Sequence, residues 1–150
     1  MSTVSTKMAS RVGEPAWEVA RLFPDQGYWT EEDYLDLTNT TNCLVEFSDG
    51  FIEVLPAPTT SHHMILAFLY RALLAFIESQ KLGTVLFAGI RVRLRKGKYC
   101  EPDIVFMLAE HADRIGEKYW QGADLVIEVV SGDEKDRERD IVDPENWTTD

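Results

Sequence analysis

Two carboxylate residues stand in apolar, β-branched stretches of this 150-residue chain. Asp103 follows a proline and opens the run 104–108, and Glu128 lies within the run 124–130. A charge in a buried strand is costly unless something compensates it. Two carboxylates on neighbouring strands could share a divalent metal ion, as in a metal-dependent phosphodiesterase. Alternatively, Asp103 caps a loop and Glu128 pairs with a lysine or arginine.

The charge balance argues against broad, nonspecific binding of nucleic acid. The formal net charge is −11 and the sequence pI is near 4.7, whereas such binding requires lysine and arginine to displace counterions. Much of the acid is local, in residues 31–33 and 133–150, while residues 91–98 are basic and lead to Asp103. The net charge is therefore only weak evidence against DNA as a binding partner.

Cysteine content and hydropathy indicate the compartment. Cys43 and Cys100 are the two cysteines and form no CxxC pair, which favours reduced thiols in a cytoplasmic protein. No apolar stretch reaches the ~18 residues that span a bilayer, and residues 1–7 lack the apolar core of a signal peptide. We expect neither membrane insertion nor export.

The first half of the chain predicts an arm, a helix and a hairpin. Residues 1–27 read as a weakly ordered arm. Thr30 followed by three acids is typical of a helix start. The runs 44–48 and 51–55 flank Asp49-Gly50, a strong hairpin signal. By default, Glu46 and Glu53 lie on the wet face of this hairpin.

A long helix is predicted from about His62 to Lys81. Because it is apolar nearly all round, we expect it to be central and packed on more than one side. His62 and His63 fall in its first turn. They are either surface or capping residues, or an imidazole there assists at a metal or phosphate site.

The basic segment alternates cleanly in a strand-like pattern, with apolar residues at 90, 92 and 94 and arginines between them. The basic side chains form either an exposed strand face or a ridge that contacts phosphates. These residues are Arg91, Arg93, Arg95 and Lys98.

Five motifs in a fixed order carry a resemblance to a known family. They lie at residues 29–35, 45–50, 58–62, 101–106 and 122–131. With these motifs the chain resembles the Uma-two family of restriction-endonuclease-like proteins, a branch of the PD-(D/E)XK nuclease superfamily. The resemblance covers roughly residues 28–142, which we take as a nuclease-like domain, with 143–150 as a C-terminal tail.

The resemblance implies an α/β fold, a mixed sheet flanked by helices with a restriction-endonuclease-like core. It implies that Asp103 and Glu128 bind Mg²⁺ or Mn²⁺, that Glu46 completes the acidic site and that His62 matches the family histidine. The expected activity is a metal-dependent endonuclease acting on DNA.

Two departures from the family pattern concern its lysine. Val130 stands two residues after the second acid, where the motif lysine would be, and Pro144 occupies the later position at which a family lysine is usually found. Lys135 could reach the site from the turn. Without a cation to stabilise developing charge, cleavage should be weak, so a nuclease-fold binding or regulatory module is the alternative.

The long apolar helix also bears on assembly. One small sheet covers only part of such a helix, and exposed apolar surface usually marks a partner surface. We therefore expect a homodimer, the commonest symmetric assembly.

Overall fold

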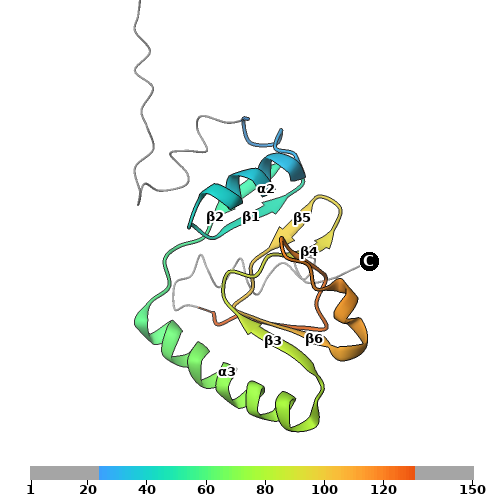
Figure 1. Cartoon of the computed structure of the whole chain (residues 1–150). Helices are drawn as coiled ribbons and strands as arrows, with labels where there is room; N and C mark the ends of the chain where they lie inside the picture. The colour runs from blue at the N-terminus through green and yellow to red at the C-terminus, as the bar shows by residue number, and fades with distance from the viewer. Residues whose placement is uncertain (1–23, 131–150) are drawn as a thin grey trace, which may run out of the picture.

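The computed structural model describes residues 24–130, which form an α+β fold of layered helices and sheets (Figure 1). The predicted arm up to residue 23 and the predicted tail from 143 lie outside this range. The elements in chain order are α2 (Glu31–Thr40), β1 (Val45–Ser48), β2 (Phe51–Val54), α3 (Thr60–Gln80), β3 (Gly83–Phe87), β4 (Val92–Arg95), β5 (Lys98–Cys100), β6 (Ile104–Leu108), the 3-10 helix η1 (Ala109–Arg114), β7 (Trp120–Gln121) and β8 (Leu125–Ile127).

The strands form two sheets. The five-stranded sheet has the order β2-β1-β5-β4-β7, and the three-stranded sheet has the order β3-β6-β8. All pairs are antiparallel except β4 and β7, which makes the larger sheet mixed. The predicted fold class, a mixed sheet flanked by helices, is confirmed.

Three apolar clusters show how the layers stack. Tyr34 of α2 packs with Phe47 and Tyr99 on the outer face of the five-stranded sheet. Cys100 packs with Met107 between the two sheets. A third cluster joins α3 to the other face of the three-stranded sheet. The order is therefore α2, five-stranded sheet, three-stranded sheet, α3.

Local chemistry sets the hairpin and the start of α2, as predicted. The side chain of Thr30 accepts a hydrogen bond from Asp33 N–H and the Asp33 carboxylate accepts one from Thr30 N–H, a reciprocal capping box. Asp49 and Gly50 have φ of 46° and 90°, the left-handed conformations that this two-residue turn requires. The Gln26 side chain bonds both backbone groups of Ile52, so the segment just before residue 28 is attached to the hairpin.

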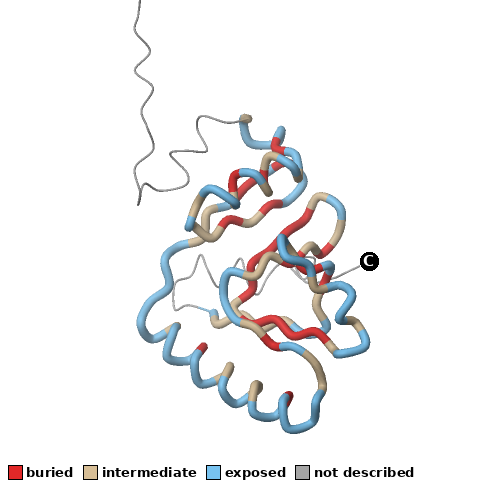
Figure 2. Tube along the Cα trace, in the orientation of Figure 1, coloured by how far each residue is buried: buried red, intermediate tan, exposed pale blue. Residues whose placement is uncertain are grey.

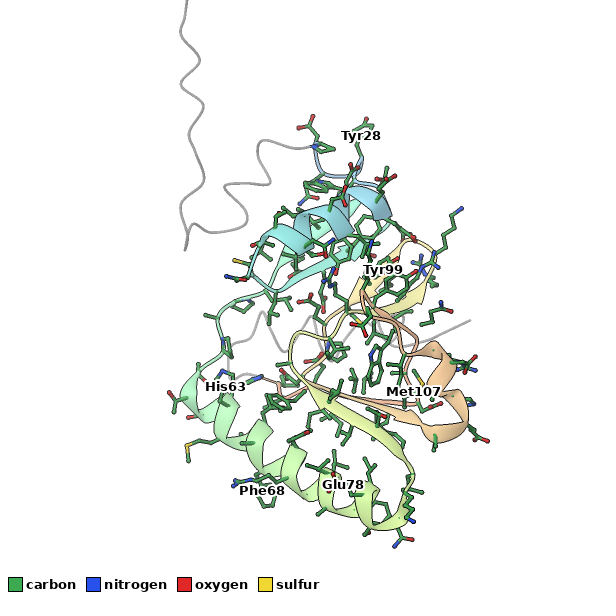
Figure 3. All side chains as sticks on the ribbon, viewed as in Figure 1. Tyr28, His63, Phe68, Glu78, Tyr99 and Met107 are labelled. Atoms are coloured by element: carbon green, nitrogen blue, oxygen red, sulfur yellow. The ribbon has the colours of Figure 1, made fainter. Side chains whose placement is uncertain are left out.

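The prediction that α3 is packed on more than one side is wrong for the described part of the chain. Only Leu66 and Ile77 of α3 are buried, because one side of the helix lies on the three-stranded sheet while the opposite side faces outward (Figure 2). Figure 3 shows Phe68 on that outer side, where it is 66% exposed.

The length and composition of α3 also correct the expectation drawn from hydropathy. Arg71 is the only charged residue between Thr60 and Ile77, and by length and composition alone α3 could cross a membrane. In the structure, Leu66 and Ile77 of α3 pack against the three-stranded sheet.

Candidate active site

His62 and Asp103 meet where α3 begins and β6 begins. The Oγ of Thr59 accepts a hydrogen bond from His62 N–H at 3.2 Å and caps the helix. The Nε2 of His62 lies 2.9 Å from Oδ1 of Asp103, and each side chain is 16% exposed. The other carboxylate oxygen, Oδ2, accepts a hydrogen bond from Val129 N–H at 2.7 Å. The Asp103 carboxylate is thus held at both oxygens, close to solvent.

The register of β6 and β8 places Asp103 beside Glu128. Ile104 pairs with Ile127 in this antiparallel ladder, so the next position along it brings Asp103 opposite Glu128. Asp103 and Glu128 lie one residue outside the two strands, Asp103 in contact with His62 of α3 and Glu128 near enough to the Cys100 thiol for its charge to raise the pKa of that thiol. The two acidic runs are neighbours, as predicted. That the two carboxylates share one ion stays a prediction.

Glu46 approaches from the five-stranded sheet. Its Oε1 accepts a hydrogen bond from the backbone N–H of Glu101 at 3.2 Å, two residues before Asp103, and the side chain is half-buried. The expectation that Glu46 lies on the solvent-exposed face of the hairpin is therefore wrong.

The thiol of Cys100 indicates which charges share this region. Burial, followed by the negative charges of Glu46 and Glu128, raises the pKa of the Cys100 thiol, while the positive charge of Lys98 lowers it. Glu46 belongs to β1 and Lys98 to β5, while Glu128 follows β8, so three separate parts of the chain bring charge near the Cys100 thiol. The candidate site is the set His62, Asp103, Glu128 and Glu46.

Glu101 is a buried acid to which the sequence assigned no role. It is 7% exposed, and its Oε2 has no hydrogen-bond partner among the described residues. Burial raises the pKa of the Glu101 carboxyl to about 7, against the opposing effects of Arg91 and a hydrogen bond from Val45 N–H. Its charge also raises the pKa of Tyr34, whose hydroxyl donates a hydrogen bond to the carbonyl of Val45. In the sequence, the one feature that could have indicated this buried acid is its position two residues before Asp103, next to an apolar stretch.

The arginines of the basic segment contact α2 and the hairpin. Arg93 forms an ion pair with Glu31 at 2.9 Å. Arg95 bonds both carboxylate oxygens of Asp49, at 2.9 and 2.8 Å, and these bonds lower the pKa of that carboxyl. Their alternation with buried apolar residues is confirmed. Their role in phosphate binding stays a prediction.

The other two basic residues of this segment, Arg91 and Lys98, also lie within the fold. Arg91 donates a hydrogen bond to the Oγ of Thr38 at 2.7 Å. Lys98 is 7% exposed, so it lies inside the fold rather than on an open ridge. Lys135 lies outside the described residues.

A second histidine–aspartate pair lies at the opposite end of β6. Nδ1 of His111 is 2.8 Å from Oδ1 of Asp124, and Oδ2 of Asp124 accepts a hydrogen bond from Leu108 N–H at 2.7 Å. These contacts tie η1 to the start of β8. The length of β6 separates this pair from Asp103, so we assign the pair a structural role.

The carboxylate oxygens of the candidate site are the kind of ligand that a hard divalent cation such as Mg²⁺ prefers. Within residues 24–130, no group of three or more histidine, cysteine, aspartate or glutamate side chains is placed to hold one ion. Magnesium is commonly bound by one or two carboxylates together with water and substrate phosphates. The pair Asp103 and Glu128 fits that kind of site without a third protein ligand.

A layered α+β fold with a histidine and carboxylates at the strand ends defines a protein of the restriction-endonuclease-like class. The chain belongs to the Uma2 family, described as "Putative restriction endonuclease", whose model matches residues 31–143. No curated protein gives a significant match to the chain. The family generally implies use of a divalent metal, and DNA is the substrate that a nuclease of this kind suggests.

Proposed function

We propose that the protein is a metal-dependent endonuclease that hydrolyses DNA phosphodiester bonds. The observation that carries the proposal is the contact between His62 and Asp103, beside the position of Glu128 in the ladder. Membership of a family of restriction endonucleases supports it.

Asp103 and Glu128 would supply the oxygen ligands of Mg²⁺ or Mn²⁺. Glu46, which the resemblance implied as a further ligand, would lie outside this pair, because no three such side chains within residues 24–130 are grouped to hold one ion. When bound, such an ion polarises the phosphate and lowers the pKa of its water. Nε2–H of His62 donates a hydrogen bond to the Asp103 carboxylate and would hold that carboxylate in place for the metal ion. Lys135 is a further candidate to assist.

The basic segment would position the DNA backbone. Arg95 is the best placed of its arginines, because its side chain is 37% exposed and its partner Asp49 is 61% exposed. Arg91 and Arg93 would reach phosphates only by exchanging their contacts with α2. Contacts of this type set register on the duplex and carry no sequence information.

The test is a plasmid cleavage assay with Mg²⁺ or Mn²⁺, comparing the wild-type protein with Asp103→Asn and with Asp113→Asn. Asp113 is exposed in η1, so its variant is the matched control. We expect metal-dependent cutting by the wild type and the control, and loss of at least a hundredfold in Asp103→Asn. Equal cutting by all three proteins would assign the activity to a contaminant.

The second candidate function is a binding or regulatory module that does not cut. The net charge of −11 and Val130 in place of the motif lysine favour it. DNA binding without cleavage at any metal concentration would support this alternative.

We further propose a homodimer that forms through the outer side of α3. Met64, Ile65, Phe68 and Phe76 make this side apolar and are 50–69% exposed. Light scattering at micromolar concentration should give twice the monomer mass of 17.1 kDa. Phe68→Glu should give a monomer, while Tyr28→Glu, which changes an exposed aromatic residue elsewhere, should leave the dimer intact. A wild-type mass of 17.1 kDa refutes the dimer.

A cytoplasmic location is also proposed, because Cys43 and Cys100 are free thiols. Fractionation of cells that produce the full chain tests it.

A further inference from the structure

Two acids connect β1 to the chain where it leaves the five-stranded sheet for β6. In the ladder between β1 and β5, Phe47 pairs with Tyr99, so two positions further Val45 comes opposite Glu101. There, Oε1 of Glu46 accepts a hydrogen bond from Glu101 N–H at 3.2 Å, and the Glu101 carboxylate accepts one from Val45 N–H. These two reciprocal bonds fix the point at which the chain leaves β5.

The segment from this point to Asp103 is short and stiff. Only Pro102 stands between Glu101 and Asp103, and its side chain is fully buried. The proline ring fixes its own φ and restricts Glu101 to extended conformations. On the other side, the carbonyl of Asp103 accepts a hydrogen bond from Ala88 N–H at 2.8 Å. The backbone of Asp103 is therefore held from both sides, and the bond from Glu101 N–H to Glu46 is one of the two anchors.

The position of this backbone determines where the Asp103 carboxylate lies. Its oxygens reach Nε2 of His62 at 2.9 Å and the N–H of Val129 at 2.7 Å. A displaced backbone would lengthen both contacts, because they are made to α3 and to the residue that follows Glu128. Replacing a residue that orients a metal-binding carboxylate typically costs about 10–100-fold in metal affinity or activity.

The contact between Glu46 and Glu101 needs an oxygen atom but no negative charge. An amide oxygen accepts a hydrogen bond from a backbone N–H as a carboxylate oxygen does. A metal ligand of the Mg²⁺ type, by contrast, depends on its carboxylate. Within residues 24–130, no three side chains of the ligand types are grouped to hold one ion, which favours the role of acceptor for Glu46.

We propose that Glu46 is a positioning residue of the nuclease site, which holds the Asp103 carboxylate in place through the N–H of Glu101. The inference rests on the proposed function, and it departs from the ligand role that the family resemblance implied for Glu46. Glu46 touches neither the metal ion nor the phosphate. It acts through the backbone of residues 101–103.

The experiment compares Glu46→Gln, Glu46→Leu and Glu53→Leu with the wild type. Glu53→Leu is the matched control, because Glu53 is exposed and pairs with Glu46 across the same hairpin. Three quantities are measured well below the lowest unfolding midpoint. They are the cleavage rate with Mn²⁺, the Kd for Mn²⁺ without DNA by calorimetry, and the imidazole NMR signal of His62 without metal. The loss of one imidazole signal in His62→Gln identifies the signal of His62.

We expect Glu46→Leu to lose about 10–100-fold in cleavage or in affinity for Mn²⁺ and to move the His62 signal. Glu46→Gln keeps an oxygen that accepts the Glu101 N–H, so it should exceed Glu46→Leu at least fivefold in the same quantity and leave the signal in place. Glu53→Leu should match the wild type throughout. The signal of His111 should stay fixed in every variant, because the His111 pair lies at the other end of β6.

Two results would overturn the role of Glu46. Losses that differ by less than about fivefold between Glu46→Gln and Glu46→Leu would make the carboxylate itself the essential group, as in a metal ligand. An unmoved His62 signal in Glu46→Leu would show that the bond to Glu101 does not position Asp103. Should Glu46→Leu fail to fold, Glu46→Ala replaces it, and unfolding of both variants overturns the proposal, because the bond then serves the fold.

A further outcome separates this inference from the function on which it rests. A wild type that binds Mn²⁺ but never cuts refutes the nuclease function. The His62 signal and the Kd for Mn²⁺ still decide the role of Glu46 in that case, because neither measurement requires cleavage.

Discussion

Replacing Glu101 by glutamine should make the stability of the protein less sensitive to pH. The carboxyl is 7% exposed, and burial raises its pKa from the ordinary value of 4.5 to about 7. Between these two values the folded state holds a proton that the unfolded state has released. The contribution of Glu101 to stability is therefore complete below about pH 4.5 and is lost as pH rises toward 7.

The size of this loss is about 3 kcal/mol, since each pKa unit corresponds to about 1.4 kcal/mol. Glutamine keeps the shape and cannot ionise, although its amide has no assured partner at the position of Oε2. That missing partner should cost about 1–3 kcal/mol at pH 5. At pH 8 the variant should equal or exceed the wild type.

Urea unfolding of both proteins at pH 5, 6, 7 and 8, with chelator present, measures the difference directly. We expect the difference in unfolding free energy to change by about 3 kcal/mol across this range in favour of Glu101→Gln. Glu110→Gln, which alters an exposed glutamate, should track the wild type within about 0.5 kcal/mol. A parallel pH dependence of wild type and Glu101→Gln would refute the assignment of a buried, protonated carboxyl.

Three substitutions test the packing around α2 and the hairpin. Tyr34→Phe removes a buried hydrogen bond of 2.8 Å to the carbonyl of Val45 and should lower the unfolding free energy by about 1–2 kcal/mol in urea. Glu31→Gln removes the charge that Arg93 faces and should cost about 1–3 kcal/mol, with a smaller effect in 1 M salt. Gly50→Ala would place a Cβ 2.5 Å from a backbone oxygen at a φ of +90°, so circular dichroism should show a fall in the melting temperature. A melting temperature equal to that of the wild type would contradict the strained turn.

The hairpin and the start of α2 could be predicted because their causes are local. Asp49-Gly50 specifies a two-residue turn, and Thr30 with Asp33 specifies a capping box, whatever the rest of the chain does. Short-range chemistry of this kind is read directly from the printed residues.

The surroundings of α3 could not be predicted in the same way. Its periodicity shows that the helix is apolar, but the number of sides that are covered depends on which other elements reach it. In the described part of the chain only the three-stranded sheet does so, and Phe68 and Phe76 stay exposed.

The part of the candidate site that depends on strand pairing could be predicted from the sequence. The two acidic runs, read as neighbouring strands, give the positions of Asp103 and Glu128. The contact between His62 and Asp103 joins residues 41 positions apart. The helix start gave a histidine at the site as one of two alternatives, and the family resemblance favoured His62. No sequence pattern showed that Glu101 would be buried, because that depends on how the elements around it pack.

The two sides of the five-stranded sheet carry different charges. On the α2 side, Arg93 and Arg95 form ion pairs with acids of the chain, so they would contact DNA phosphates only by exchanging these pairs. Between the sheets, the negative charges of Glu46 and Glu128 raise the pKa of the Cys100 thiol. A net charge of −11 repels DNA at distances up to the ~10 Å over which salt leaves charges unscreened. In the proposed nuclease function, attraction would arise at contact, where a divalent ion opposes the charge of the phosphate, so we expect DNA binding and cleavage to depend on the same ion.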